Sequence, residues 1–588
     1  MSKCTPRENI LAKCGGMALL PHVTVVIVAW LSVSVISDVH GSDDGPLVGL
    51  KQGKYRGNYV TSTNGEYVAE YLGIPFAEPP TGDLRLANPK PRTPNPEEVY
   101  HAKTYGASCP QAIDRVFDNF SGATMWNPPG GVMSEDCLFL NVWVPQKTSG
   151  QSKTVMVWIY GGGFYSGTSS LWIYNGKTVA AFKDVIVVSF NYRLGALGFL
   201  STGDDRIQGN FGFMDQVLAL KWIRDNIKTF GGDPNKVTIV GESAGAVSVT
   251  YHLLSPLSDG LFQRAIIQSH AADSLVFNDR EQARRGAIKF FERLRCKDNV
   301  DILKCLRKIS FQTLVAKQWL PDGRRLHKPT ISPFMPQRPE VLLRERGFKK
   351  KAVLIGSNKN EGTYFMIYRL KSVSIKDPVS GQTQQNIKEA ISYFHTDLDE
   401  DQKERVFKYY TENIDEYDLV GNRNAIDALM GDRYFTCPST YVAENNAAVG
   451  GETYYYYYSH RASIEVWPAW MGVIHSAEIQ FMFGMPLNDT SGYTDKEKRF
   501  SERLLSYWTN FAKSGNPNGH GNSPWPKYTS SKKEFLELVL QEKKHSGGLR
   551  TDQCRFWSSL VGSGGNRGYV SSTSVVVLVI VTVFGVTA

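Results

Sequence analysis

Long hydrophobic runs, blocks of like charge, internal repeats and low-complexity segments are scarce in this chain of 588 residues. The C-terminal apolar stretch, Val575 to Ala588, is shorter than the roughly 20 residues that a membrane-spanning helix needs. The net charge of +9 comes from Lys and Arg spread along the sequence, apart from short basic groups at Arg344 to Lys351 and Lys532 to Lys533. This distribution is typical of a solvated basic surface, and we predict no nucleic-acid partner.

Cysteine is also rare, with eight residues, and none has the spacing of metal ligands. We predict neither a metal nor an organic cofactor. Cys4 and Cys14 fall in an N-terminal segment that we expect to be removed, which leaves six cysteines and 15 possible pairings. Proximity in the sequence favours one set over the other 14: Cys109–Cys137, Cys296–Cys305 and Cys437–Cys554.

Both ends of the chain look like processing signals. Basic residues and an apolar stretch from Val23 to Ile36 predict a secretory signal over residues 1–41. Small residues, a polar spacer and a short apolar tail over 563–588 are typical of a signal for a glycolipid (GPI) anchor, with a plain tail anchor as the alternative. Between them we predict a single catalytic domain, 42–562. We expect a secreted or cell-surface, membrane-anchored glycoprotein, with sequons at Asn119 and Asn488.

The fold class follows from short apolar runs that alternate with helical segments. Such continuous runs suit strands that are covered on both faces of a parallel sheet. One helix is expected over Met214 to Phe230, closed by Gly231 to Pro234. We predict an α/β protein with a large, mostly parallel central sheet and crossover helices. The predicted strands are Val155 to Tyr160, Val185 to Phe190, Val237 to Val240, Ala265 to Gln268, Val353 to Ile355 and Thr453 to Tyr458.

The motif Gly241-Glu-Ser-Ala-Gly245 lies directly between the predicted strand Val237 to Val240 and a helical stretch, Ala246 to Leu254. A G-x-S-x-G motif in this context forms a tight strand-to-helix turn that exposes the serine hydroxyl at the helix N-terminus. We therefore predict Ser243 as the nucleophile of a serine esterase.

A serine nucleophile needs a histidine base and an acid, in the chain order serine, acid, histidine. Eight histidines follow Ser243, so spacing alone leaves the base open; His475 stands out in a loop-like apolar segment. Glu361, in the loop after the strand Val353 to Ile355, is a candidate acid. Backbone N–H groups of Gly162 and Gly163, directly after a strand, suit an oxyanion hole because glycine allows close approach.

These motifs, together with Ser134 to Val144, resemble the carboxylesterase/cholinesterase family over nearly the whole presumed mature chain. The resemblance implies an α/β-hydrolase fold whose insertions form a deep gorge, and hydrolysis of choline esters, acetylcholine first, which would end cholinergic signalling. It implies the triad Ser243, Glu361 and His475, with Ala244 as a third oxyanion donor. The three favoured cysteine pairs coincide with the disulfides of the family.

The resemblance also implies two cation sites. A quaternary ammonium has no N–H to donate and binds over aromatic faces, best on Trp. The inner, choline-binding site would comprise Trp126, Glu242, Tyr364 and Tyr174, and the outer, peripheral site Trp319, Tyr165, Tyr368 and Asp114.

The acyl pocket departs from the family pattern. We assign it to His327, Pro329 and Phe365, and the family's pocket Trp corresponds to Leu275 or Val276. Acyl groups larger than acetyl are therefore expected to fit. Two alternatives stay open, namely a broad-specificity carboxylesterase and a non-catalytic, neuroligin-like adhesion protein, and a scavenging role would use the same serine. The apolar faces of Phe500 to Phe511 and Phe556 to Leu560 are compatible with a homodimer.

Overall fold

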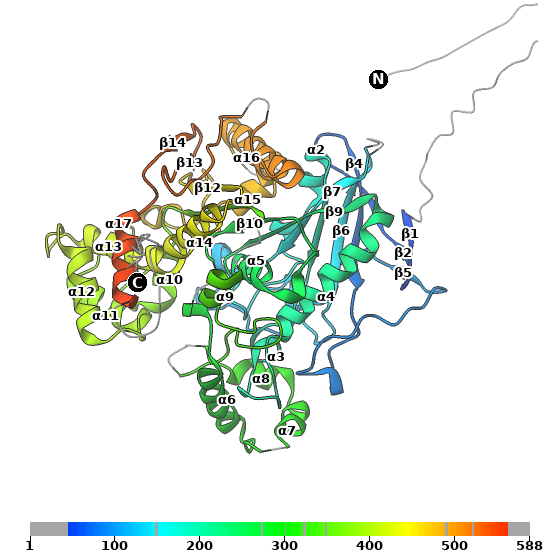
Figure 1. The fold of residues 1–588 in the computed structure, drawn as a ribbon, viewed down its shortest axis with the longest axis horizontal. Coiled ribbons are helices and arrows are strands. Elements are labelled where there is room, and N and C mark those ends of the chain that lie inside the picture. The colour runs from blue at the N-terminus through cyan, green and yellow to red at the C-terminus, as the bar shows by residue number, and fades with distance from the viewer. Residues whose placement is uncertain are drawn as a thin grey trace, which may run out of the picture. The chain divides into compact units, whose positions relative to one another are not determined.

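One large sheet dominates the computed structural model of this chain (Figure 1). The structure describes residues 45–147, 151–271, 274–299, 301–321, 325–346, 350–488, 492–519 and 522–562, and these residues belong to one compact unit. The predicted signal over 1–41 and the predicted anchor signal over 563–588 lie outside the described residues. No helix in the described ranges is both long and apolar enough to cross a membrane.

Within the described residues the sheet has eleven strands, and a separate three-stranded sheet is formed by β1 (Leu47–Leu50), β2 (Gly53–Arg56) and β5 (Val99–His101). In spatial order the large sheet comprises β14 (Lys543–His545), β13 (Phe535–Leu538), β12 (Thr453–Tyr458), β11 (Ala352–Asn358), β10 (Arg264–Gln268), β9 (Gly232–Glu242), β7 (Lys153–Ile159), β8 (Ile186–Phe190), β6 (Phe139–Pro145), β4 (Tyr67–Pro75) and β3 (Asn58–Thr61).

The strands from β13 to β8 in this order run parallel, whereas the pairs at both ends of the sheet are antiparallel. All six predicted strands are present and the mostly parallel sheet is confirmed. Every residue of β8 is buried, as expected for a strand covered by helices on both faces. β9 begins already at Gly232, so most of the turn predicted over Gly231 to Pro234 is strand.

Helices connect these strands. The predicted helix is present as α4, which starts at Phe211 and is followed by a 3-10 turn to Phe230. All residues of α5 are buried, which explains its apolar character on every side. The helices of at least seven residues are α2 (Lys177–Lys183), α4 (Phe211–Asn226), α5 (Ala244–Leu254), α6 (Arg280–Leu294), α7 (Ile302–Lys308), α8 (Phe311–Lys317), α9 (Pro339–Arg346), α10 (Thr363–Arg369), α11 (Gln384–Phe394), α12 (Glu400–Thr411), α13 (Leu419–Gly431), α14 (Cys437–Ala448), α16 (Asp495–Ser514) and α17 (Thr551–Gly562).

Two groups of helices extend from the sheet. Figure 1 shows α6, α7 and α8 together below the sheet, and α11, α12, α13 and α17 together beside it. A second, smaller apolar core lies under the first group and includes Phe290, Phe291 and Leu306. The three predicted disulfides are all present: Cys109–Cys137, Cys296–Cys305 and Cys437–Cys554.

The apolar face of α16 does not remain available for a partner chain. Phe500, Leu504, Trp508 and Phe511 are fully buried in the main core. Phe556 of α17 stacks on Tyr409 of α12, with ring centroids 4.0 Å apart. The apolar periodicity that suggested a dimer contact in the sequence therefore reflects packing within the chain.

The parallel strands bring the loops that carry the predicted site to one edge of the sheet. Glu242 at the end of β9 is in register with Gln268 at the end of β10, which is in register with Gly356 of β11. Side chains that follow these strands converge because the carboxyl ends of parallel strands share one edge.

Candidate active site

Ser243 occupies a strained turn between β9 and α5. Its backbone angles, φ 57° and ψ −122°, lie outside the regions that L-residues ordinarily adopt. A Cβ on Gly245 would collide with the carbonyl oxygen of Ile159, and one on Gly241 with the backbone of Gly245. Both glycines of the motif are thus required by close packing, and the turn presents Ser243 at the N-terminus of α5.

The glycine run after β7 packs directly against this turn. A Cβ on Gly161 would lie 2.9 Å from Cβ of Ser243, so no side chain fits between the two segments. Gly162 and Gly163 have φ values of 101° and 60°, in the left-handed region that favours glycine. Gly162, Gly163 and Ala244 line the same cavity as Ser243, so their backbone N–H groups are candidates for an oxyanion hole.

His475 and Glu361 meet from loops that are far apart in the sequence. Nδ1 of His475 lies 2.6 Å from Oε2 of Glu361, and both side chains are buried. Glu361 also accepts a 2.6 Å hydrogen bond from the backbone N–H of Asn358 at the end of β11. The hydrogen bond between His475 and Glu361 orients the imidazole and favours a proton on Nδ1, which leaves Nε2 as the basic nitrogen.

Nε2 of His475 faces a second carboxylate, Glu242, at 3.1 Å. Ser476 donates a further hydrogen bond of 2.6 Å to Glu242. Burial lowers the pKa of His475, but the charges of Glu242 and Glu361 outweigh burial and raise that pKa above its usual value. Burial raises the pKa of Glu242, and this effect outweighs the nearby charge of His475, which lowers that pKa. The pair therefore retains a proton to higher pH than either group would in water.

No hydrogen bond joins Ser243 to His475 among the described residues, because Nε2 is directed at Glu242. The two side chains nevertheless line the same cavity. Hydrogen bonds between nucleophile and base are often long in unliganded sites and shorten when substrate binds.

A cavity of about 760 Å³ opens above Ser243. Its size and its mixture of aromatic and polar walls are typical of a small-molecule site. No cluster of His, Cys, Asp or Glu suited to a metal ion is found in the described residues. The predicted site residues that line the cavity are Ser243, His475, Gly162, Gly163, Ala244, Trp126, Glu242, Tyr364, Tyr174, Trp319, Tyr165 and Phe365.

The inner aromatic residues pack together near Glu242. The rings of Trp126 and Tyr174 lie 6.4 Å apart, and Tyr174 in turn packs on Trp158 at 5.1 Å. Trp126 is half-buried, so part of its ring borders the cavity. Its loop is closed by the Cys109–Cys137 disulfide.

The residues predicted for the outer site form two linked pairs. Trp319 and Tyr165 pack edge to face with centroids 4.7 Å apart. Tyr368 donates a 2.7 Å hydrogen bond to Asp114, and its hydroxyl lies 3.2 Å from that of Tyr364. Tyr368 and Asp114 are not lining residues, so they connect to the cavity through Tyr364.

The acyl-pocket prediction needs correction at two residues. His327 and Pro329 do not line the cavity. The ring of His327 instead packs against Phe290 of α6 at 4.7 Å, and the carbonyl of Pro329 accepts a hydrogen bond from Asn278. Leu326 and Lys328 line the cavity in their place.

Sequence reasoning also missed residues that surround His475 and line the cavity. The ring of Phe435 lies 4.7 Å from that of His475 and stacks on Phe365 at 5.3 Å. Phe435 belongs to a short π-helical segment, Asp432–Thr436, between α13 and α14. π-helical turns often occur at functional sites, but no sequence motif marks this one.

The two predicted glycosylation sites are both accessible. Asn119 and Asn488 are exposed in the structure, as an acceptor for a glycan must be.

A family model described as the carboxylesterase family matches residues 44–557, nearly the whole described part of the chain. The chain belongs to the carboxylesterase family. Its eleven-stranded sheet is accordingly that of an α/β-hydrolase, and the chain is a serine carboxylic ester hydrolase.

Individual members of the carboxylesterase family match over most of their length. The acetylcholinesterase of Electrophorus electricus is 38% identical, with 92% of this chain and 91% of the relative covered. The acetylcholinesterase of Bungarus fasciatus is 40% identical (87% and 86% covered), and the cholinesterase of Mus musculus is 41% identical (87% and 86% covered). The family resemblance predicted from the sequence is confirmed.

Proposed function

We propose that this carboxylesterase hydrolyses choline esters, acetylcholine first. The observation that carries the proposal is the placement of Trp126 and the carboxylate of Glu242 in the cavity that contains Ser243. An aromatic face and a negative charge together suit a cation that cannot donate hydrogen bonds. The relatives named acetylcholinesterase and cholinesterase support the same substrate class.

In the proposed mechanism, Ser243 attacks the ester carbonyl while Nε2 of His475 accepts its proton. Glu361 keeps the imidazole oriented and stabilises its charged form, and the N–H groups of Gly162, Gly163 and Ala244 stabilise the oxyanion. His475 then gives its proton to the departing choline, and water repeats the sequence on the acyl-enzyme. Nε2 must turn from Glu242 to Ser243 for the first step.

The first test measures acetylthiocholine hydrolysis by the variant Ser243→Ala. Turnover should fall by about 10⁴-fold or more, because the residual rate comes from binding and the oxyanion hole alone. Near-ultraviolet circular dichroism checks that the variant folds. Retained turnover in a folded variant would remove Ser243 from the mechanism.

The second test separates choline esters from neutral esters with Trp126→Ala. We expect kcat/KM for acetylthiocholine to fall by about 30-fold, which corresponds to ~2 kcal/mol of cation–π attraction in a desolvated site. The neutral isostere 3,3-dimethylbutyl thioacetate should lose much less. Trp470→Ala, on a half-buried Trp outside the cavity lining, is the control and should not change the ratio. Equal losses for both substrates would favour a broad-specificity carboxylesterase.

A broad-specificity carboxylesterase is the second candidate function, and the lining of the acyl side of the cavity supports it. Leu275 and Val276 line the cavity there, and their small aliphatic side chains leave room for acyl groups larger than acetyl. Acetyl-, propionyl- and butyrylthiocholine, with a neutral ester beside them, measure this preference. The non-catalytic, neuroligin-like alternative is not favoured, because such relatives lack the serine nucleophile.

We also propose that the chain is exported, glycosylated at Asn119 and Asn488, and attached to the outer membrane face through a C-terminal lipid anchor, where it would end cholinergic signalling. Release from intact cells by phosphatidylinositol-specific phospholipase C tests the anchor. A homodimer remains a prediction for sedimentation analysis; it would use surfaces other than the buried face of α16.

A further inference from the structure

Charge is divided unevenly over the wall of the catalytic cavity. Among its described lining residues Glu242 is the one carboxylate, and it lies on the side of Trp126 and Tyr174. The cationic lining residues are Arg285, Lys289, Arg325, Lys328 and Arg369. A substrate with only a positive charge would use one side of this cavity and be repelled by the other.

Arg325 is the most informative of these cations. Its guanidinium lies 5.5 Å from the ring centroid of Tyr165, and its buried Nη1 has no hydrogen-bond partner. No ion pair joins it to a carboxylate in the described part of the chain. Burial lowers the pKa of Arg325 to about 10, so the group still carries its charge at neutral pH. Arg325 is partly buried, and a partly buried cation without a counter-charge in the described residues favours an anionic ligand.

Arg325 lies between the outer aromatic pair and the acyl side of the cavity, because it contacts Tyr165 and pairs with Trp319 in a β-bridge while Leu326 and Lys328 come next in the chain. Leu326 and Lys328, the lining residues that replace the predicted acyl-pocket pair, follow it in the chain. Nζ of Lys328 donates a 2.7 Å hydrogen bond to the carbonyl of Leu275, which ties this segment to the other acyl-side wall. Tyr165, whose ring lies under the guanidinium, follows Gly162 and Gly163 in the chain, and both Tyr165 and Arg325 line the cavity that contains Ser243.

Helix α6 adds a second cationic surface. Gln282, Arg285 and Lys289 are spaced by three and four residues and line the cavity from one helical face. Arg285 pairs with Glu281 at 3.0 Å, whereas Lys289 is exposed.

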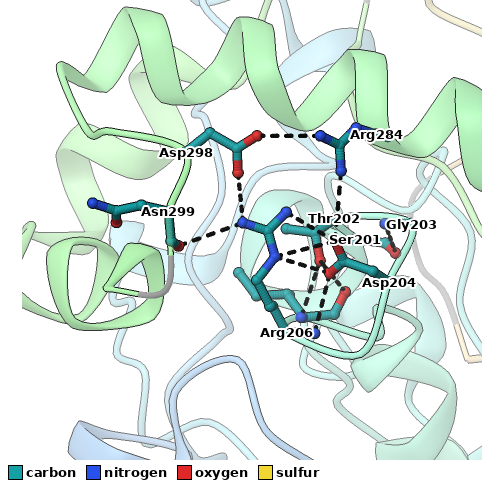
Figure 2. A network of polar contacts seen from close by, with 9 residues as sticks. Ser201, Thr202, Gly203, Asp204, Arg206, Arg284, Asp298 and Asn299 are labelled. Carbon is teal, nitrogen blue, oxygen red and sulfur yellow. Dashed lines mark hydrogen bonds and ion pairs between the residues drawn. The ribbon is translucent and has the colours of Figure 1, made fainter.

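The opposite side of α6 is anchored to neighbouring loops. Figure 2 shows Arg284 between Asp204 and Asp298, at 3.6 and 3.8 Å, with Arg206 bridging the same two carboxylates. In this network Asp204 and Asp298 are both paired with arginines on the side of α6 away from the cavity. The cations on the cavity side are thereby held in place without local neutralisation by Asp204 or Asp298.

We propose that the acyl side of the cavity binds an acyl chain that ends in a carboxylate, so that choline monoesters of dicarboxylic acids are a preferred substrate class. The inference rests on the proposed function, since it assumes that Trp126 and Glu242 hold the choline. Arg325 would bind the terminal carboxylate, in two parallel hydrogen bonds where geometry allows, and Lys289 would strengthen the positive field. Ser243 takes the acyl group, choline leaves, and water releases the dicarboxylic acid.

The experiment compares two thiocholine esters of nearly identical shape. One is the glutaric acid monoester, with a free terminal carboxylate, and the other is its terminal amide. The ratio of their kcat/KM values isolates the charge of the acyl end from its size. We expect the carboxylate to be preferred by at least about tenfold at low salt, as for a charge-assisted hydrogen bond.

Variants identify the residue responsible. Arg325→Met should reduce the carboxylate-to-amide ratio by about tenfold or more, and Arg325→Lys should restore part of it because the charge is kept. Lys289→Met, at an exposed helix position that folding tolerates, should reduce the ratio by a smaller factor. Arg224→Met removes the same charge from the exposed side of α4 and should leave the ratio as it is. The concentration of active sites is measured by titrating Ser243 with an organophosphate. Rates are divided by this concentration, so that misfolded protein does not affect kcat.

The outcomes separate the two proposals. Loss of the preference in Arg325→Met or Lys289→Met supports the anionic acyl site. Turnover of acetylthiocholine together with a ratio at or below one, or with a ratio that neither variant changes, overturns the inference and leaves the choline-ester function intact. Failure to hydrolyse any thiocholine ester while a neutral ester is cleaved overturns the proposed function itself.

Discussion

At the scale of single residues, the imidazole of His475 lies between two carboxylates with different surroundings. Glu361 holds Nδ1 at 2.6 Å and is itself fixed by the backbone, whereas Glu242 faces Nε2 at 3.1 Å. Glu361 can only orient and stabilise, because it lies behind the ring. Glu242 can also compete with Ser243 for Nε2, and it therefore influences the pH at which the base becomes available.

The prediction at this scale concerns Glu242→Gln. His475 must be neutral to act as a base, so activity is lost as the pH falls through its raised pKa. Removal of the Glu242 charge lowers that pKa, and the acid limb of kcat/KM should move to lower pH by about one pH unit or more. A neutral ester is the substrate, because it does not depend on choline binding.

Glu400→Gln serves as the control for this shift. Glu400 is 89% exposed on α12, so its loss removes the same charge without a change near His475. An acid limb that stays in place in Glu242→Gln would mean that Glu242 does not set the pKa of the base.

At the scale of elements, loops at the carboxyl edge of the sheet carry the site, and each is held by a different device. Tight packing of glycines fixes the turn around Ser243 and the run after β7. A disulfide, Cys109–Cys137, closes the loop that carries Trp126. This difference implies that the proposed choline recognition can be weakened separately from ester cleavage.

We predict that the double variant Cys109→Ala/Cys137→Ala loses selectivity for charged substrates. Without the disulfide the loop samples more conformations, so kcat/KM for acetylthiocholine should fall by about tenfold or more relative to the neutral isostere. The stability cost should be about 3–4 kcal/mol for a loop with a sequence separation of 28.

The matched control is Cys437→Ala/Cys554→Ala. Its sequence separation of 117 predicts a larger loss of stability, about 5 kcal/mol, but the two cysteines join α14 to α17 away from Trp126. The ratio of charged to neutral substrate should therefore not change in this variant. A similar change of the ratio in both double variants would attribute the effect to general destabilisation.

At the scale of the whole molecule, four buried histidines couple the fold to pH. Burial lowers the pKa of His252, His270 and His327 to about 3, and that of His395 well below its usual value. The ring nitrogens of His252 are satisfied by Ser258 at 2.7 Å and Gln216 at 2.8 Å, in a neutral network. Protonation of His252 has to break this network, and protonation of the other three rings has to place a charge in the buried interior.

We predict a steep loss of stability between pH 7 and pH 5. In this range the unfolded chain binds protons on these histidines and the folded chain does not, so stability is present above about pH 6.5 and is lost as pH falls toward 3. Each histidine should contribute about 2 kcal/mol between pH 7 and pH 5. Urea unfolding at the two pH values measures the effect, and His252→Gln should reduce the difference by about that amount. A free energy of unfolding that is constant over this range would contradict the prediction.

Local signals explain why much of the fold and site could be predicted. The strands could be predicted from continuous apolar runs, and the strand-to-helix turn around Ser243 from glycines at fixed spacing between a strand and a helix. His475 was harder, since eight histidines follow the serine, and the family resemblance was needed to select it. The acyl side was mispredicted because the segment around His327 departs from the family's sequence. It has no periodic pattern that indicates whether His327 or Lys328 faces the cavity.

The α/β class, the family, the disulfide pairs and the turn that exposes Ser243 could be predicted without a structure, because each depends on local pattern or on resemblance over the whole chain. Which side chains share the cavity depends on tertiary packing. Glu242 faces Nε2 of His475, and Arg325 and the inner face of α6 form a cationic wall, through contacts between segments distant in sequence. Such contacts arise from packing against the sheet edge, and no single segment encodes them.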